Sequence, residues 1–202
     1  EHFGLSWPGK REARRLASLP SRGTLLPVLG EGVSEDTTSN LFIEGENLEV
    51  LKLLQKAYAG QIKLIYIDPP YNTGNDFIYN DNFTDPLGAY LRSTGQADEA
   101  GALTTNTRAD GRFHSNWLSM IYPRLRLARP LLRDDGFLVV SIDDAEAHNL
   151  RMVLNEVFGE ENYLATLVWD RNRKNDARFF SVGHEYMLVY AKAKEVLIER
   201  DV

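Results

Sequence analysis

The sequence predicts an α/β sandwich whose sheet is mostly parallel and ends in an antiparallel hairpin. Two observations lead to this expectation. Short β-rich runs alternate along the chain with segments whose apolar residues recur at helical spacing, which is typical of an α/β fold. The runs at residues 63–67 and 136–142 are nearly continuously apolar, which is typical of parallel strands that are covered on both faces.

Residues 1–40 are predicted to form an N-terminal arm over the core. This segment has little periodicity and many prolines and glycines, so only one short helix is expected in it, around residues 10–19. Its Gly30-Glu31-Gly32 pattern is followed by polar and acidic residues in place of an amphipathic helix. We therefore do not expect this pattern to bind a cofactor.

The sheet and its helices are predicted to occupy residues 41–202. A short buried strand is expected at residues 41–43, followed by a helix with apolar residues from Leu48 to Tyr58 and a stop at Gly60. The strand at residues 63–67 then runs directly into Asp68-Pro69-Pro70-Tyr71. Because proline has no N–H for a sheet ladder, this strand must end there.

Asp68 is the first candidate for a functional side chain. Ligands of open α/β sheets bind outside the carboxyl ends of the strands, and Asp68 follows such an end. The long polar segment at residues 72–116 is predicted to be an active-site loop, because a loop of this length in a compact domain is usually functional or mobile. A rigid turn that merely leaves the strand would also explain Asp-Pro-Pro.

The second half of the chain predicts two more helices, another strand and a hairpin. A helix at residues 117–132 is expected to kink at Pro123, and a buried strand follows at residues 136–142. Asp144 is expected to cap the next helix, which Gly159 closes. A hairpin is expected from residues 163–169 and 185–191. The aromatic residues expected to lie in the core, and not to stack on a base, are Trp117, Trp169 and Tyr186.

Composition excludes several classes of function. The chain has no cysteine and only four histidines, none paired at helical or zinc-finger spacing, so we expect no disulfide, no thiolate nucleophile and no metal site. No apolar run has the length of a membrane span, so a cytoplasmic location is expected. The net charge of −6 argues mildly against nucleic-acid binding, although basic residues gather in three clusters.

The Asp68-Pro69-Pro70-Tyr71 motif resembles the signature of amino-methyltransferases that act on adenine N6. Nearly the whole chain resembles the modification subunits of type III restriction-modification systems. The segments that carry this resemblance are residues 7–12, 40–48, 64–75, 94–96, 110–115, 122–125, 141–144 and 184–192. The resemblance implies a Rossmann-like, S-adenosylmethionine-dependent methyltransferase fold, with residues 41–202 as the catalytic part of its domain. It also implies double-stranded DNA as substrate, a homodimer and a restriction subunit as partner.

The residue types of the motif suit methyl transfer to an aromatic amine, which is a poor nucleophile because its lone pair is delocalised into the ring. Asp68 and the carbonyl of Pro69 can each accept a hydrogen bond from one N–H of the amine, which favours a pyramidal nitrogen. Pro69 and Pro70 stiffen the main chain, so positioning and electrostatics supply most of the catalysis. Tyr71 offers a face for the base, which must first leave the duplex stack.

Further residues are assigned to the cofactor and to DNA. The resemblance implies that Glu46 meets the adenine of the cofactor, although an acid that stabilises the start of the following helix explains Glu46 equally well. Asp68 and Asn72 complete the predicted cofactor set, and Gly74 and Phe77 are candidates for shaping the pocket. The basic loop at residues 170–181 is predicted to contact DNA phosphates through Arg171, Arg173, Lys174 and Arg178.

The glycine-rich cofactor loop of the family is not found in the sequence. In the permuted, β class of these enzymes this loop follows the target-recognition region, so we expect the chain to be a fragment that lacks both and is inactive alone. It should then bind S-adenosylmethionine weakly or not at all, which calorimetry would test. The alternative functions are methylation of cytosine N4, methylation of an amine in RNA, or a non-catalytic DNA-binding subunit of the same fold.

Overall fold

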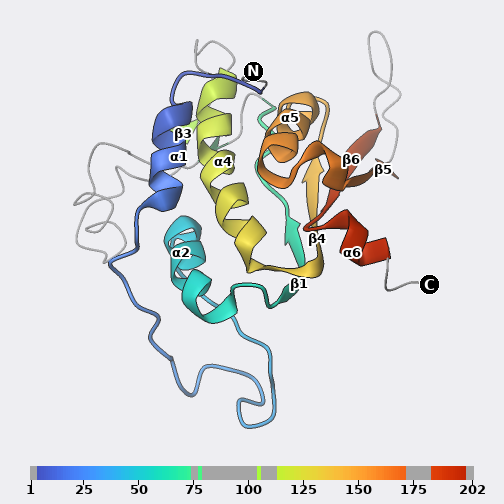
Figure 1. Ribbon diagram of the computed structural model, residues 1–202. Coiled ribbons are helices and arrows are strands. Elements are labelled where there is room, and N and C mark those ends of the chain that lie inside the picture. Colours follow the sequence, from blue (N-terminus) through green and yellow to red (C-terminus); the bar gives the residue numbers. More distant parts are fainter. Residues whose placement is uncertain (1–3, 74–76, 79–103, 106–112, 172–182, 199–202) are drawn as a thin grey trace.

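The computed structural model describes residues 4–73, 77–78, 104–105, 113–171 and 183–198 (Figure 1). Its elements are, in chain order, α1 (Lys10–Ser18), α2 (Asn47–Tyr58), β1 (Ile62–Ile67), β2 (Phe77–Ile78), β3 (Thr104–Thr105), α4 (Phe113–Leu131), β4 (Leu132–Ile142), α5 (Ala147–Phe158), the 3₁₀ turn η1 (Glu160–Asn162), β5 (Tyr163–Asp170), β6 (His184–Ala191) and α6 (Lys194–Ile198). The predicted alternation of strands and helices is therefore confirmed. The short pair β2 and β3 lies inside the segment that was predicted to be a long loop.

The main sheet is mixed, which corrects the prediction of a mostly parallel one. Its strand order is β1-β4-β6-β5. β1 pairs with β4 in parallel, whereas β4 and β5 both pair with β6 in antiparallel register. The predicted hairpin is confirmed, and it is the reason for the difference, because β6 lies between β4 and β5 and makes both of its pairings antiparallel.

Helices cover one face of this sheet (Figure 1). The strand residues Leu138, Val140, Ile142, Leu188 and Tyr190 are buried there in one cluster with apolar residues of α4 and α5. The opposite face is open within the described ranges, and it exposes Leu64, Tyr66, Leu167 and Trp169. The expectation that the strand at residues 63–67 is covered on both faces is therefore wrong, since Leu64 is 49% exposed.

The N-terminal segment packs on the sheet's helices only at its start. The predicted helix is confirmed as α1, and Trp7 meets Tyr122 of α4 edge to face, with 5.4 Å between ring centroids. Residues 22–42 are exposed. The predicted buried strand at residues 41–43 is wrong, because this segment pairs with no strand among the described residues and Phe42 is 92% exposed. An apolar triplet alone does not distinguish a strand from exposed chain.

The predicted helix of residues 117–132 is confirmed as α4, which begins four residues earlier, at Phe113, and contains Pro123 and Pro130. No described helix is long and apolar enough to cross a membrane. α5 begins after Glu146 and ends at Phe158, and the positive φ of 93° at the following Gly159 permits the turn. Asp144 is not the cap that was predicted, because α5 has Glu146 at its N-cap position. The Asp144 carboxylate accepts a hydrogen bond from the Tyr186 hydroxyl at 2.7 Å.

Gly136 lies in β4 where backbone oxygens of β1 and β4 surround it closely. A Cβ atom on this residue would lie 2.9 Å from the carbonyl oxygen of Arg133 and 3.0 Å from those of Ile62 and Lys63. Backbone oxygens cannot yield as a side-chain end can. The spacing of the two parallel strands therefore requires glycine at this position.

Candidate active site

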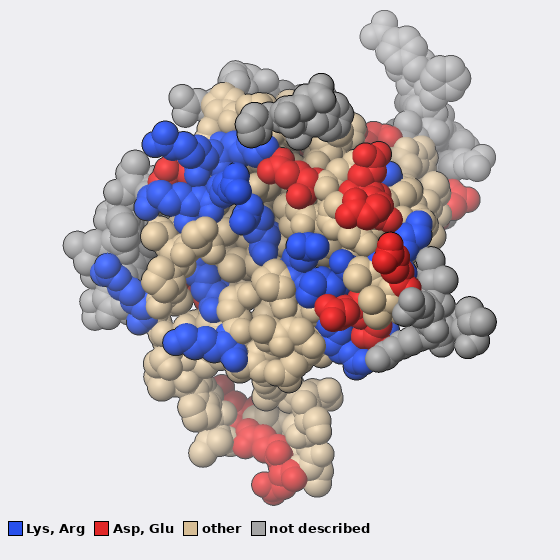
Figure 2. All heavy atoms as spheres, in the orientation of Figure 1, with Lys and Arg blue, Asp and Glu red and all other residues tan. Residues whose placement is uncertain are grey.

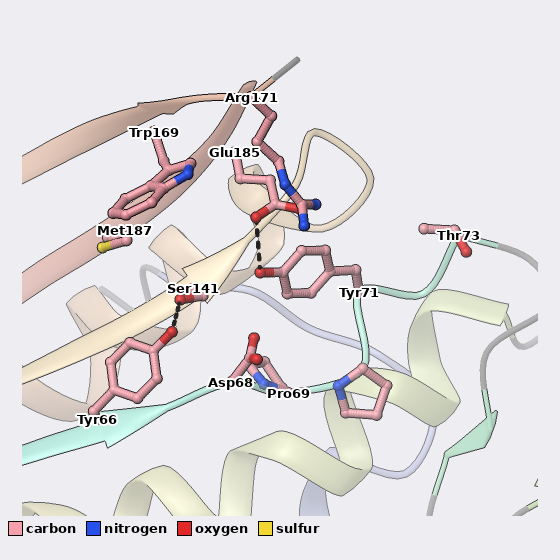
Figure 3. A pocket seen from close by; sticks show the side chains of 11 residues that line it. Tyr66, Asp68, Pro69, Tyr71, Thr73, Ser141, Trp169, Arg171, Glu185 and Met187 are labelled. Atoms are coloured by element: carbon pink, nitrogen blue, oxygen red, sulfur yellow. Dashed lines mark hydrogen bonds and ion pairs between the residues drawn. The ribbon is translucent and has the colours of Figure 1, made fainter. Parts of the chain in front are cut away.

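An open cavity of about 730 Å³ lies at the carboxyl end of β1 (Figure 3). Ligands of α/β sheets bind at this edge. The cavity is lined by Tyr66, Asp68, Pro69, Pro70, Tyr71, Thr73, Ser141, Trp169, Arg171, Glu185 and Met187. The whole Asp68–Tyr71 motif therefore contributes to one cavity, together with the ends of β4, β5 and β6.

Asp68 follows the last residue of β1, where the two prolines end the strand. Its carboxylate points into the cavity, between β1 and the ring of Tyr71 (Figure 3). An inward-turned aspartate that caps the backbone, as a simple turn would need, is not what the structure has. Asp68 is therefore available to a ligand.

Tyr71 extends across the cavity toward β6. Its hydroxyl donates to Oε2 of Glu185 at 3.4 Å, and the ring stands above Asp68 (Figure 3). Burial raises the pKa of Tyr71, and the negative charges of Asp68 and Glu185 raise it further. The phenol is therefore neutral at physiological pH, with one ring face toward the cavity.

The diproline turn is held from behind by α4. The indole N–H of Trp117, a completely buried residue, donates to the carbonyl oxygen of Pro70 at 2.6 Å. Trp117 was predicted to lie in the core, which is confirmed. Its hydrogen bond also fixes the main chain of the motif, so this core residue contributes directly to the geometry of the cavity.

Two residues predicted for the cofactor lie outside the cavity lining. Asn72 is completely buried, has a φ of 60°, and donates from Nδ2 to Oε1 of Glu146 at 2.5 Å. Glu46 accepts hydrogen bonds from the backbone of Leu48 and Glu49 at the start of α2. It also pairs with Arg124 at 3.1 Å. Glu46 thus has the helix-capping role that the sequence left open, and cofactor contacts of both residues stay predictions.

Of the four basic residues predicted for DNA, Arg171 lines the cavity and forms an ion pair with Glu185 (Figure 3). Arg173, Lys174 and Arg178 lie outside the described residues, as does Gly74. The side chain of Phe77 is likewise outside them. DNA contact by this loop therefore stays a prediction.

The sequence reasoning missed several residues of the cavity. Trp169 was predicted to lie in the core, but it is 57% exposed and lines the cavity (Figure 3). The hydroxyl groups of Tyr66 and Ser141 are 2.5 Å apart across β1 and β4. Ser141 and Met187 are opposite each other in the β4–β6 register. Strand alternation could have placed these residues on one face, but only the pairing shows that the face borders the cavity.

Tyr186 and Asp144 are two further residues for which the sequence made a prediction. Tyr186, which was predicted to lie in the core, is half-buried against its edge, and Asp144 does not line the cavity. Asp143 accepts from the backbone N–H of Ala145 at 2.9 Å. Within the described residues no group of three or more histidine, aspartate or glutamate side chains could hold a metal ion.

Residues 62–201 match the family of N6/N4 methyltransferases that is described as DNA methylase. The chain belongs to this DNA methylase family. The match includes β1, the Asp68–Tyr71 motif, β4 and the hairpin, so it covers every element that borders the cavity.

Two curated relatives of this DNA methylase chain are similar over nearly its whole length. The Mod subunit of the type III restriction-modification enzyme EcoP15I from Escherichia coli is 44% identical over 98% of the chain, and that of EcoPI from Escherichia phage P1 is 44% identical over 97%. The chain spans only 31% of the length of each relative. The solved PvuII DNA methyltransferase, which is cytosine-N4-specific, has a TM-score of 0.43 at 14% identity, with 72% of this chain and 47% of that chain covered.

Proposed function

We propose that this chain supplies the catalytic part of a site-specific DNA methyltransferase that modifies adenine at N6 in a restriction-modification system. One observation carries the proposal: the carboxylate of Asp68 faces an open cavity at the end of β1, with Pro69, Pro70 and Tyr71 in the same lining. The two relatives are described as type III Mod subunits, which supports the same kind of system.

The chemistry follows from the acceptors at this strand end. The carboxylate of Asp68 and the carbonyl of Pro69 would each accept one N–H of the exocyclic amine. This would turn the nitrogen lone pair away from the ring plane. The hydrogen bond from Trp117 to Pro70 limits movement of the turn, so little reorganisation is needed during the reaction. Catalysis would then rest on positioning, which can supply several orders of magnitude.

S-adenosylmethionine is the proposed methyl donor, and when bound it would supply an electrophilic methyl group on a sulfonium. Of the three residues predicted to contact it, Asp68 fits best, because its carboxylate borders the cavity. The carboxylate of Glu46 is already bonded to α2 and Arg124, and the amide of Asn72 is bonded to Glu146. A cofactor contact by Glu46 or Asn72 would therefore require these bonds to open or to be shared.

Double-stranded DNA is the proposed substrate, and its target adenine would have to leave the stack to reach Asp68. Arg171 is the described cation at the rim of the cavity. Lys and Arg side chains also gather over α1 and α4, whereas Asp and Glu side chains gather beside them over α5 (Figure 2). The charge is thus segregated despite the net charge of −6. A homodimer and a restriction subunit are proposed on the resemblance alone.

The proposal is tested by replacing Asp68→Ala in the full-length polypeptide that carries this chain. Without the carboxylate acceptor, incorporation of N6-methyladenine into DNA should fall by about a hundredfold or more. The measurement is mass spectrometry of nucleosides from DNA treated with each purified variant in the presence of the methyl donor.

Asp134→Ala is the matched control, because Asp134 is an exposed carboxylate on β4, away from the cavity. It should leave methylation unchanged. Full activity of the Asp68→Ala variant would refute the catalytic assignment and favour a non-catalytic subunit. If N4-methylcytosine appeared in place of N6-methyladenine, or if a parallel assay methylated RNA while DNA stayed unmodified, the proposed substrate would be wrong although the site would stand.

A further inference from the structure

Glu146 is a buried carboxylate that lies outside the cavity, between β4 and α5. Its side chain has no exposed surface. Three side chains satisfy it: Asn72 Nδ2 donates to Oε1 at 2.5 Å, His114 Nδ1 lies 2.6 Å from the same oxygen, and Asn149 Nδ2 donates to Oε2 at 2.8 Å. A carboxylate is costly to bury, so it persists only with such partners.

Asn72 connects Glu146 to the Asp68–Tyr71 motif. It directly follows Tyr71, and its backbone has a left-handed conformation with φ of 60°. Asparagine tolerates this conformation better than most residues, yet the conformation is favoured only when surrounding contacts hold it. The hydrogen bond to Glu146 is one such contact. It anchors the first residue after the Asp68–Tyr71 motif.

A second contact holds the motif from the same side. Trp117 donates to the carbonyl of Pro70, and His114, one helical turn earlier in α4, contacts Glu146. Pro70 and Asn72, on either side of Tyr71, are thus each hydrogen-bonded to a buried side chain, that of Trp117 or that of Glu146. The direction of the Tyr71 ring, and with it the space above Asp68, depends on these two attachments.

We propose that Glu146 is a positioning residue for the methyl transfer, acting through Asn72 on the orientation of Tyr71 and Asp68. This inference rests on the proposed function. It assigns Glu146 no contact with substrate or cofactor. It also gives Asn72 a role that differs from the cofactor contact expected from the sequence, and the two roles can be separated by experiment.

The experiment exchanges the two polar groups of the contact in the full-length polypeptide. Asn72→Asp keeps the shape and the tolerance for positive φ, but it places a second carboxylate against Glu146. The kcat for DNA methylation should fall by about a hundredfold, because repulsion displaces the motif. The double variant Asn72→Asp with Glu146→Gln restores one donor and one acceptor, and it should recover most of this loss while the KM for DNA stays near that of wild type.

Hydrogen exchange of the backbone amides at residues 66–73 gives a readout that does not need activity. Exchange there should rise in Asn72→Asp and return toward wild type in the double variant. Asn162→Asp is the matched control, because Asn162 is a buried amide at the other end of α5, bonded to the carbonyl of Phe158 at 2.7 Å. It should lower stability without changing either exchange at residues 66–73 or kcat.

The outcomes separate the inference from the function on which it rests. If wild type methylates DNA but Glu146→Gln fails to rescue Asn72→Asp, Asn72 does not act through Glu146 and the inference is wrong. If Asn162→Asp matches Asn72→Asp in kcat, the effect is general destabilisation and the inference also fails. If wild type itself methylates no DNA, the proposed function fails, and the exchange data alone decide whether Glu146 positions the motif.

Discussion

Tyr71 has two properties that can be tested separately, an aromatic face and a hydroxyl group whose ionisation is suppressed. The hydroxyl makes a long hydrogen bond to Glu185, at 3.4 Å, which contributes little. The ring borders the cavity above Asp68. If stacking of the target base is the role of Tyr71, the ring should matter for activity and the hydroxyl should not.

The pH dependence of stability tests the environment of this hydroxyl. Burial, and then the charge of Asp68, raise the pKa of Tyr71 above its usual value. The neutral phenol therefore makes its full contribution to folding stability below a pH of about 10, where free tyrosine ionises. This contribution is lost as the pH rises through the pKa of the folded state. The free energy of unfolding, measured by urea denaturation, should therefore decrease above this pH more steeply for wild type than for Tyr71→Phe.

Tyr58→Phe, at the end of α2 and away from the cavity, is the control for a change in tyrosine number. Equal slopes for wild type and Tyr71→Phe above pH of about 10 would mean that Tyr71 ionises as freely as in the unfolded chain. That result would contradict the burial of the phenol that the structure shows.

At the level of single residues, the sequence predicted the central feature and missed its surroundings. Asp68 lies at a strand end beside a cavity because two prolines must terminate the strand, which is a local effect. Trp169 was assigned to the core because large aromatics are usually buried. Its exposure depends on which face of the hairpin borders the cavity, and this is decided by long-range pairing with β6.

The start of α2 is the clearest example of an element whose stability depends on one side chain. Glu46 accepts from two backbone N–H groups, and its pairing with Arg124 compensates a guanidinium that is almost fully buried. Glu46→Ala should therefore lower the free energy of unfolding by about 1–2 kcal/mol. Chemical denaturation monitored by circular dichroism measures the difference.

Glu12→Ala provides the comparison within α1, since Glu12 pairs with Arg15 three residues later on a solvated surface. That change should cost only about 0.3–0.5 kcal/mol. If both variants lost the same amount, the cap of α2 would contribute no more than a surface ion pair, contrary to the geometry at Glu46.

Elements with a periodic pattern and a stop signal were predicted well, and isolated apolar residues were not. α2 falls where helical spacing and the stop at Gly60 indicated it, and α1, α4 and α5 also lie in the segments predicted to be helical. The triplet at residues 41–43 has no partner strand in the part of the chain that the structure describes, so its composition alone could not make it a strand. The predicted cap of α5 was wrong because the helix begins after Glu146, two residues beyond Asp144.

For the molecule as a whole, the largest departure from expectation is the uncovered face of the sheet. Leu64, Tyr66, Leu167 and Trp169 expose apolar surface there. A contiguous apolar surface of this kind is unusual for a polypeptide in isolation, and it promotes association. Continuous apolar strands predicted two covered faces, but the covering layer is not formed by the described residues of this chain.

The isolated 202-residue chain should therefore bind the dye ANS and associate as its concentration rises. Replacing Leu64→Lys and Leu167→Lys together should roughly halve the dye fluorescence and delay association, because charges disfavour contact between such faces. Fluorescence titration and light scattering measure both effects. Dye binding that is unaffected by the two lysines would place the accessible apolar surface elsewhere.

The geometry of the sheet depends on the absence of a side chain at Gly136. This residue lies at the opposite end of β1 from Asp68, where three carbonyl oxygens leave no space for even a methyl group. An alanine there would act as a wedge between the parallel strands, and β1 would carry the displacement along its length to the turn. The alignment of the acceptors in the cavity is therefore sensitive to a single carbon atom introduced at the far end of the strand.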